Sequence, residues 1–205
     1  KSPRLFGYAE DSGFVEHKEA GMKWMSEFGL KIHQPEQVLL TNGAQHALST
    51  LILMFSQPGD KIAMESVTYP GIISIVQELG RIPVAVQMDE HGVIPESLAE
   101  VIHRDNISLA IVVPSHQNPT GATMPVERRE KIAAIVERFN IKLIEDDIYS
   151  FLNDSVLPPL ANLLPKNTFY ISSLSKAISP GIRCGFIKAP SQYASKIGRF
   201  IRSSI

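Results

Sequence analysis

Residues 173–186 read SLSKAISPGIRCGF, with Lys176 close to the start of the run. Two apolar segments flank it: residues 167–172 (NTFYIS) have the composition of a short buried strand, and so do residues 184–188 (CGFIK). Lysine is rarely found inside a protein without a partner. Lys176 is therefore either an ordinary lysine of a surface loop or a lysine kept beside the core for its chemistry.

The neighbours of Lys176 favour the chemical alternative. Ser173 and Ser175 precede it, and Arg183 follows seven residues later. A lysine amine forms Schiff bases with carbonyl groups, and an arginine beside hydroxyl groups binds phosphate. A cofactor that carries both an aldehyde and a phosphate, pyridoxal 5'-phosphate, needs this combination.

The bulk composition fits one globular domain. The 205 residues are 44% hydrophobic, which is enough for one sizeable core. The formal net charge is −1 and no basic stripe stands out, so this segment gives no sign of nucleic-acid binding. Cys184 is the one cysteine, which excludes an internal disulfide, and its apolar surroundings favour a buried structural thiol.

The sequence carries no membrane or export signal that we can recognise. No apolar stretch approaches the roughly 20 residues that a membrane helix needs, and no signal peptide is visible. We therefore expect a cytoplasmic protein, and we see no metal-ligand cluster. The chain opens on Lys1 and stops at Ile205, inside an expected helix that begins at residue 191, so we expect a piece of a longer protein.

Apolar strands alternate with helical patterns along the whole chain. We expect strands at residues 38–41, 61–65, 83–87, 109–113, 141–145, 168–172 and 184–188. Helices are expected at residues 16–28, 44–55, 71–79, 95–103 and 126–139, and the longest irregular stretch at residues 153–167. Nearly continuous apolar strands separated by helices indicate an α/β fold, a three-layer α/β/α arrangement with a mostly parallel sheet.

Unusual residues gather where four of these strands end. They lie in residues 41–45 (TNGAQ), 115–121 (SHQNPTG), 146–149 (DDIY) and 173–176 (SLSK). In open α/β sheets, ligands bind beyond the carboxyl ends of the strands. One such cluster would mean little, but four on one chain are hard to attribute to turn chemistry alone.

Several of these residues suit parts of a pyridoxal 5'-phosphate site. Gly43 lets the backbone approach a ligand, and the helix that starts after it offers unpaired N–H groups to a phosphate. Asp146 could keep a pyridine nitrogen protonated, so that the ring absorbs electrons, or it could cap the segment after it. Asn118 and Tyr149 could hydrogen-bond the ring oxygen. Tyr69 could stack on the ring or be an ordinary half-buried aromatic residue.

In this order, the motifs resemble those of the large domain of fold-type I aminotransferases, the class I/II enzymes that depend on pyridoxal phosphate. The resemblance runs from end to end and is carried by Tyr8 with Gly13, residues 41–45, Tyr69, residues 118–121, Asp146 with Tyr149, and Ser173 with Lys176 and Arg183. It implies that residues 1–205 are a truncated large domain, without the N-terminal segment and the C-terminal small domain. The arginine that binds the substrate carboxylate in the family is expected beyond Ile205.

The resemblance also assigns roles on the ring side. It implies that Lys176 forms an aldimine with the cofactor and later carries a proton, and that Asp146 pairs with the pyridinium. The proton transfer needs a neutral amine, so we expect Lys176 to be partly buried. Asp146 is preferred to Asp147 because it stands three residues before Tyr149, as in the family pattern. Asn118 and Tyr149 would hold the ring oxygen.

By the same resemblance, Tyr69 would stack on the ring. The phosphate would be held by Gly43, Ala44, Gln45, Ser173, Ser175 and Arg183. Tyr8 matches a tyrosine that, in the family, reaches the phosphate of the neighbouring subunit, which implies a homodimer with shared sites.

A finer resemblance leaves two functions open. Residues 40–48 (LTNGAQHAL), 114–117 (PSHQ) and the Lys176 run are similar to the MocR group, transcription regulators that join a GntR-type winged helix to an aminotransferase-like domain. Free-standing 2-aminoadipate and aromatic aminotransferases have similar sequences in these stretches. The chain is then either the domain of a MocR/GntR-type regulator, which senses an amino effector and contacts DNA only through a domain outside this chain, or a transaminase that moves an amino group between an amino acid and a 2-oxo acid. A lyase of the same fold type is less favoured.

Overall fold

A seven-stranded sheet forms the centre of the molecule. The computed structural model describes residues 13–203. The order of the strands across the sheet is β1-β9-β8-β7-β6-β2-β3. Their bounds are β1 (Val38–Thr41), β2 (Lys61–Glu65), β3 (Ile82–Val86), β6 (Leu109–Val112), β7 (Lys142–Asp146), β8 (Thr168–Ser173) and β9 (Gly185–Lys188). A separate small hairpin pairs β4 (Met88–Asp89) with β5 (Gly92–Val93).

The sheet is mostly parallel, as the sequence predicts. β8, β7, β6, β2 and β3 pair in parallel, and β9 is antiparallel to both of its neighbours, β8 and β1. Because two antiparallel steps restore the original direction, β1 runs the same way as β8. The strands β1, β2, β6, β7 and β8 therefore all end at the same edge of the sheet.

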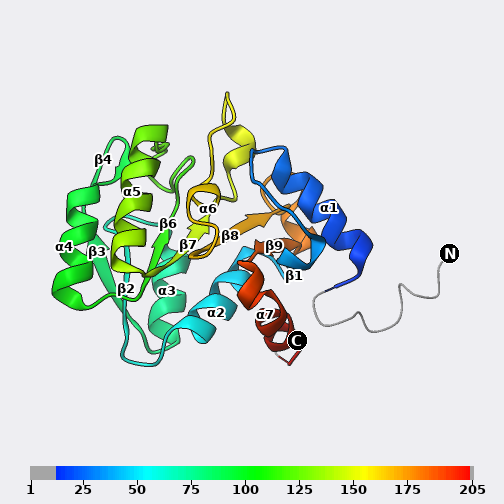
Figure 1. Ribbon diagram of the computed structural model, residues 1–205, viewed down its shortest axis with the longest axis horizontal. Coiled ribbons are helices and arrows are strands. Elements are labelled where there is room, and N and C mark those ends of the chain that lie inside the picture. The colour runs from blue at the N-terminus through cyan, green and yellow to red at the C-terminus, as the bar shows by residue number, and fades with distance from the viewer. Residues whose placement is uncertain (1–12, 204–205) are drawn as a thin grey trace.

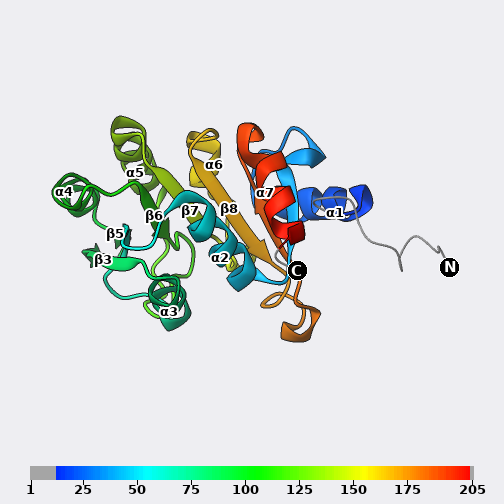
Figure 2. The ribbon, with the colours of Figure 1, turned by 90° about the horizontal axis from the view of Figure 1, so that it is seen from below.

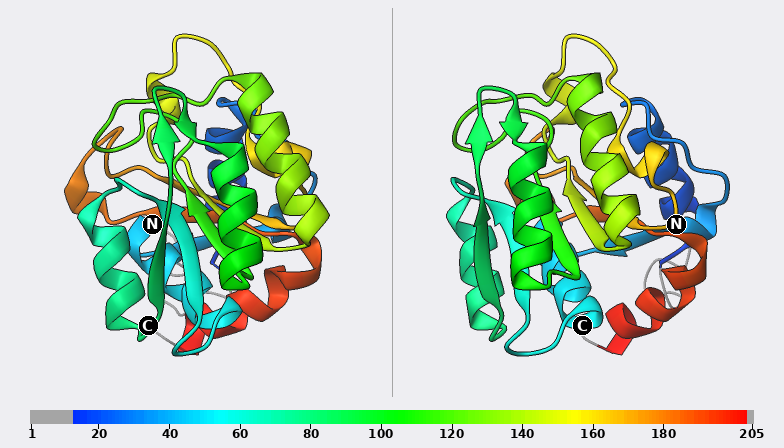
Figure 3. Two further views of the ribbon diagram at one scale, coloured as in Figure 1. Left: turned by 90° about the vertical axis from the view of Figure 1, so that its left-hand side faces the viewer. Right: turned by 60° about the vertical axis from the view of Figure 1, so that its left-hand side comes forward.

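Helices cover both faces of the sheet, which confirms the three-layer α/β/α arrangement. On one face, α2 (Ala44–Phe55), α3 (Pro70–Glu78) and α7 (Ser191–Ser203) bury their apolar residues against the strands. The other face carries α1 (Val15–Ser26), α4 (Pro95–Asp105), α5 (Val126–Phe139) and the short α6 (Leu160–Leu163). Figure 1 and Figure 2 show the two sets on opposite sides of the strands, and Figure 3 looks onto α4 and α5, which lie side by side.

The residues that follow α4 and α5 explain where these two helices end. α4 and α5 are both followed by an asparagine in the left-handed conformation, Asn106 with φ 53° and Asn140 with φ 50°. Asparagine tolerates this conformation better than most residues and is a common end signal for helices. The strand between them, β6, is buried throughout, so its apolar run corresponds to a strand covered on both faces.

One helix was not expected from the sequence. α6 lies within residues 153–167, which the sequence pattern marks as irregular. Its first N–H groups are bound by a carboxylate from the sheet: Glu145 accepts hydrogen bonds from Leu160 N and Ala161 N, both at 2.8 Å. A carboxylate at a helix N-terminus satisfies N–H groups that have no partner within the helix. The three-residue 3₁₀ turns Pro35–Gln37, Ser150–Leu152 and Pro180–Ile182 complete the elements.

Candidate functional site

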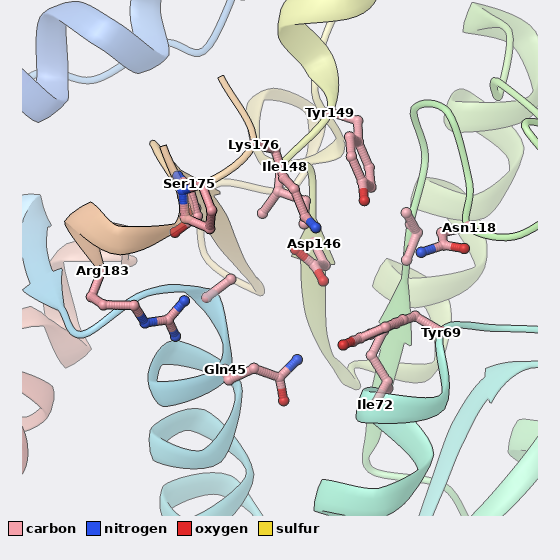
Figure 4. Close-up of a pocket in the computed structure, with 14 residues that line it drawn as sticks. Gln45, Tyr69, Ile72, Asn118, Asp146, Ile148, Tyr149, Ser175, Lys176 and Arg183 are labelled. Atoms are coloured by element: carbon pink, nitrogen blue, oxygen red, sulfur yellow. The ribbon is translucent and has the colours of Figure 1, made fainter. Parts of the chain in front are cut away.

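One cavity opens at the edge of the sheet where the parallel strands end (Figure 4). Its walls come from the ends of β7 and β8, the segments after β2 and β6, and the first turn of α2. It is lined by Ala44, Gln45, Tyr69, Ile72, Val113, Asn118, Asp146, Ile148, Tyr149, Ser173, Ser175, Lys176, Pro180 and Arg183. The structure thus brings together ten of the twelve residues that the sequence marked as a site. Gly43 stands directly behind the lining, and Tyr8 lies outside the described residues.

Lys176 projects from a turn beyond β8. Its side chain runs into the cavity toward Asp146 in Figure 4. The expectation that Lys176 is partly buried is wrong, because the residue is exposed. It belongs to a turn that stands clear of the sheet edge, and not to the strand itself. The amine can therefore be reached by a ligand that enters the cavity.

The first turn of α2 presents N–H groups beside Arg183. α2 begins after Gly43, whose φ of +81° is a conformation that residues with a side chain rarely adopt. No side chain in the described part of the chain caps the helix there, so the N–H groups of its first turn are open to a ligand. A Cβ at position 43 would come within 2.7 Å of Nη2 of Arg183, so the glycine also makes room for the guanidinium. A permanent cation and a helix N-terminus therefore meet at one point.

Another glycine supports this turn from behind. A Cβ at Gly185 would lie 2.7 Å from the carbonyl carbon of Gly43 and from Oγ1 of Thr41. Thr41 itself donates a hydrogen bond to the carbonyl oxygen of Gly43 at 3.1 Å. The backbone of β9 thus touches the backbone that precedes α2. The sequence patterns do not predict this role of Gly185. The one signal for it is its position, two residues after Arg183.

The two serines before Lys176 have different hydrogen-bonding states. Ser173 Oγ donates to the carbonyl oxygen of Cys184 at 3.1 Å and accepts from Ser175 N at 3.2 Å. Ser175 Oγ is buried and has no hydrogen-bond partner among the described residues. A buried hydroxyl without a partner is costly unless a ligand or water satisfies it. Of the two, Ser175 therefore offers the free hydroxyl.

Asp146 is the buried charge of the cavity. It is the last residue of β7, is 5% exposed, and its Oδ1 has no hydrogen-bond partner in the described part of the chain. Burial, with smaller contributions from the charges of Asp147 and Glu65, raises the pKa of Asp146 to about 7. A carboxylate in this state needs a cationic or hydrogen-bonding partner. The alternative role as a cap finds no support, because the 3₁₀ turn Ser150–Leu152 has no side-chain cap.

Asp147, next along the chain, is tied to the protein interior instead. Its Oδ2 accepts a hydrogen bond from the buried Tyr170 hydroxyl at 3.1 Å, and burial raises the pKa of Asp147. Asp147 is not among the residues that line the cavity. The geometry therefore separates the two neighbouring aspartates, with Asp146 facing the cavity.

Glu145, on the other side of Asp146, belongs to the scaffold as well. It holds the start of α6 and lies 3.8 Å from Nη1 of the fully buried Arg129. Burial, followed by the charge of Asp147, raises the pKa of Glu145 to about 8. Arg129 in turn donates to the carbonyl oxygens of Met124 at 2.9 Å and Pro114 at 3.2 Å. The buried pair of Glu145 and Arg129 therefore holds the end of β7 in place.

Tyr69, Asn118 and Tyr149 line the side of the cavity near Asp146. They come from the segments after β2, β6 and β7, and Figure 4 shows Tyr69 and Asn118 on neighbouring walls. Tyr69 is 44% exposed, and its ring lies against Gly71, where a Cβ would be 2.3 Å from Tyr69 Cε1. Gly71 thus permits the ring to lie on the first turn of α3, a role that sequence reasoning missed.

Within residues 13–203, no group of three or more histidine, cysteine, aspartate or glutamate side chains is arranged to hold a metal ion. No helix in this part of the chain is long and apolar enough to cross a membrane.

Known proteins resemble this chain along its whole length. The uncharacterized HTH-type transcriptional regulator YdeF of Bacillus subtilis is 32% identical over 196 residues, which are 96% of this chain and 42% of that protein. The aromatic amino acid aminotransferase C1773.13 of Schizosaccharomyces pombe is 32% identical over 82% of this chain and 42% of its own length. The solved structure of LysN, an alpha-aminoadipate aminotransferase from Thermus thermophilus complexed with N-(5'-phosphopyridoxyl)-L-leucine, matches with a TM-score of 0.87 at 27% identity, over 97% of this chain and 51% of LysN.

The chain thus spans about half the length of these relatives, or less. Regulators and free-standing aminotransferases both occur among them. The model of the family described as aminotransferase class I and II matches residues 1–205. Together with the fold and the composition of the cavity, this shows that the chain belongs to the class I and II aminotransferase family, whose members depend on pyridoxal phosphate.

Proposed function

We propose that this chain binds pyridoxal 5'-phosphate in the cavity of Figure 4, covalently through Lys176. The observation that carries the proposal is the buried Asp146 Oδ1, which has no hydrogen-bond partner among residues 13–203 and lies in the same cavity as an accessible lysine and an arginine. A pyridinium N–H supplies both the donor and the positive charge that this carboxylate lacks. The residues present therefore fit the cofactor.

The phosphate would lie at the start of α2. The N–H groups after Gly43, the guanidinium of Arg183 and the free hydroxyl of Ser175 converge there. Charge-assisted hydrogen bonds of this kind are among the strongest that proteins make. Ala44 and Gln45 contribute from the same turn, and Ser173 supports Ser175 through its hydrogen bond to Ser175 N.

The ring would lie on the opposite side of the cavity. Asp146 would pair with the ring nitrogen, Asn118 and Tyr149 would hydrogen-bond the ring oxygen, and Tyr69 would stack on the ring. When bound, the cofactor supplies an electron sink for charge that develops at the substrate's α-carbon. Lys176 would carry the proton between that carbon and the cofactor, which requires its amine to be neutral at that moment.

The whole protein is proposed to be a transcription regulator of the MocR/GntR type. The similarity to YdeF, and to the pyridoxine biosynthesis regulator PdxR of Corynebacterium glutamicum at 36% identity over 78% of this chain, supports this assignment. Contact with DNA would come from a domain outside this chain, and the ligand would be an amino effector. A homodimer in the cytoplasm completes the proposal, with Tyr8 reaching the partner's phosphate.

A free-standing transaminase is the second candidate, favoured by the similarity to C1773.13 and to LysN. The two candidates differ in what an amino acid does to the bound cofactor. We would add one amino acid after another to the full-length protein loaded with pyridoxal phosphate and measure pyridoxamine phosphate and 2-oxo acid.

If bound pyridoxal phosphate is converted to pyridoxamine phosphate, with one 2-oxo acid formed per cofactor and at a rate typical of an enzyme, the transaminase is supported. Binding of an amino compound without net conversion would support the regulator. Release of ammonia or carbon dioxide without pyridoxamine phosphate would contradict both and indicate a lyase.

A further inference from the structure

Two segments that carry the ring-side residues are joined by buried side chains. Residues 66–69 follow β2 and end in Tyr69, and residues 113–121 follow β6 and include Asn118. Neither Tyr69 nor Asn118 belongs to a helix or a strand. Their relative position therefore depends on what links the two segments.

Glu65, the last residue of β2, is the first part of this link. It is 3% exposed and accepts three hydrogen bonds. Its Oε1 accepts from Val113 N at 2.8 Å, and its Oε2 accepts from the Thr68 hydroxyl at 3.2 Å and from Gln117 Nε2 at 3.1 Å. One carboxylate thus contacts the segment after β2 and the segment after β6. Burial raises the pKa of Glu65 to about 7.

Gln117, next to Asn118, is the second part. It is 1% exposed, and its Nε2 donates a further hydrogen bond to the carbonyl oxygen of Val67 at 2.7 Å. Its Oε1 accepts from Thr120 N at 3.1 Å and from Thr120 Oγ1 at 2.7 Å. The side chain therefore ties its own segment to the end of β2 at Glu65 and to residues 66–69 at Val67.

The polarity of this network permits one arrangement only. If the Gln117 amide turned over, its N–H₂ group would face the Thr120 N–H, and its oxygen would face the Glu65 carboxylate and the Val67 carbonyl. Buried donors and acceptors that lose their partners cost free energy, so the turned amide is excluded. A network with a single arrangement fixes the segments that it joins.

We infer that Glu65 and Gln117 are positioning residues that hold Tyr69 and Asn118 at a set separation before a ligand enters the cavity. The inference rests on the proposed function, because it concerns the ring half of a pyridoxal phosphate site. A site that is formed in advance binds more tightly than one that must first be ordered, since the apparent affinity falls with the fraction of molecules in the competent conformation. Neither residue lines the cavity, so their effect is transmitted through Tyr69 and Asn118.

The test uses the full-length protein and three substitutions. Gln117→Leu removes the link. Glu65→Gln keeps the shape of the side chain, but its amide N–H₂ then faces either the Val113 N–H or the Gln117 N–H₂, so one of the two bonds to the segment after β6 is lost. Thr68→Val is the matched control. The Thr68 hydroxyl also donates a hydrogen bond to Glu65 Oε2, but Thr68 lies in the same segment as Tyr69, so this bond does not join the two segments. Three quantities are measured: the Kd for pyridoxal phosphate, the visible circular dichroism per bound cofactor at saturation, and the Tm.

Gln117→Leu and Glu65→Gln are expected to raise the Kd about ten-fold and to lower the visible circular dichroism by about half, because the ring is no longer held in one orientation. Thr68→Val should change the Kd by less than about two-fold. A purely structural role would lower the Tm of all three variants but leave the circular dichroism of the bound cofactor unchanged. If Gln117→Leu does not fold, the isosteric Glu65→Gln carries the test.

The inference is overturned if Glu65→Gln and Gln117→Leu bind the cofactor like the wild type with equal circular dichroism, or if Thr68→Val loses as much as they do. A wild-type protein that shows no saturable binding of pyridoxal phosphate would overturn the proposed function and this inference together. The two failures are thus distinguished by the wild-type titration.

Discussion

The two halves of the cavity are built in different ways. On the ring side, the central carboxylate Asp146 is 5% exposed, and the segments around it are joined by the buried Glu65 and Gln117. On the phosphate side, the exposed Arg183 belongs to the connection between β8 and β9. Its apolar residues Ile178 and Ile182 are also open, at 63% and 46% exposure.

The difference shows which half is fixed by the domain itself. The ring side is formed by internal hydrogen bonds and is ready before a ligand arrives. The phosphate side offers the exposed Arg183, whose Nη2 donates to the carbonyl oxygen of Asn42 at 3.4 Å, and N–H groups of α2 that no side chain of residues 13–203 caps. The exposed apolar residues of the connection are consistent with a second subunit that covers it, as the proposed homodimer requires.

The largest effect should follow from a change at the buried carboxylate. We expect Asp146→Ala to retain cofactor, because the phosphate seat is intact, but to lose the conversion of bound cofactor by an amino donor about a thousand-fold or more in a protein that transaminates. Without the carboxylate, the ring nitrogen no longer stays protonated. Single-turnover absorption measurements give the rate. Asp154→Ala, in the irregular segment away from the cavity, is the control, and equal rates for Asp146→Ala and the wild type would refute the role of Asp146.

A change on the phosphate side should weaken binding but leave the ring orientation intact. Arg183→Gln is expected to raise the Kd for pyridoxal phosphate by about 10- to 100-fold, because it removes a charge-assisted pair. At saturation, the visible circular dichroism should stay at the wild-type value, in contrast to the ring-side variants. Arg138→Gln, on an exposed part of α5, is the control. A loss of circular dichroism in Arg183→Gln would remove the distinction between the two halves.

The close approach behind the phosphate seat can be tested with a single methyl group. Gly185→Ala would place a Cβ 2.7 Å from the Gly43 backbone and is expected to lower the free energy of unfolding by about 1–3 kcal/mol, and to weaken cofactor binding as well. Gly181→Ala is the matched control, since the nearest atom to a Cβ there is Ser179 Oγ at 3.8 Å. Urea unfolding measures the difference. Equal stability of the two variants would show that Gly43 and Gly185 are not in tight contact.

The smallest effect concerns pH. The pKa of Asp146 is raised from its ordinary 3.8 to about 7 in the fold, so the folded protein binds a proton that the unfolded chain has released. Its contribution to stability is present below about pH 4 and is lost as the pH rises through about 7. Asp146→Asn should therefore reduce the fall in unfolding free energy between pH 4 and 7, by on the order of 1–3 kcal/mol without cofactor. Identical slopes in urea titrations of the two proteins would contradict the raised pKa.

Much of the fold could be predicted because its signals are local. The bounds of α2, α5, β1 and β2 agree with the predicted ranges. Gly43 marks the start of α2, and Asn140 marks the end of α5. The predicted strand at 141–145 is observed at Lys142–Asp146, a shift of one residue that makes Asp146 the last residue of β7. Periodicity identifies a strand more reliably than its ends.

What the sequence did not indicate depends on residues far apart in the chain. α6 starts on the carboxylate of Glu145, 15 residues earlier. The link between Glu65 and Gln117 spans 52 residues, and neither residue belongs to a pattern that predicts it. The wrong expectation for Lys176 has a similar origin, since an apolar strand before a residue says nothing about how far the following turn stands from the sheet. A glutamate at the end of a buried strand was the one available signal for the link.

The covalent bond to Lys176 is the central claim, and mass spectrometry tests it most directly. The full-length protein and its Lys176→Ala variant would be incubated with pyridoxal phosphate, reduced with borohydride and digested. In the wild type, we predict one phosphopyridoxyl adduct per chain, on the peptide that contains Lys176. In a folded Lys176→Ala variant, we predict no adduct at any site. A wild-type protein without the adduct, or a variant that carries the same amount of it elsewhere, would contradict the account.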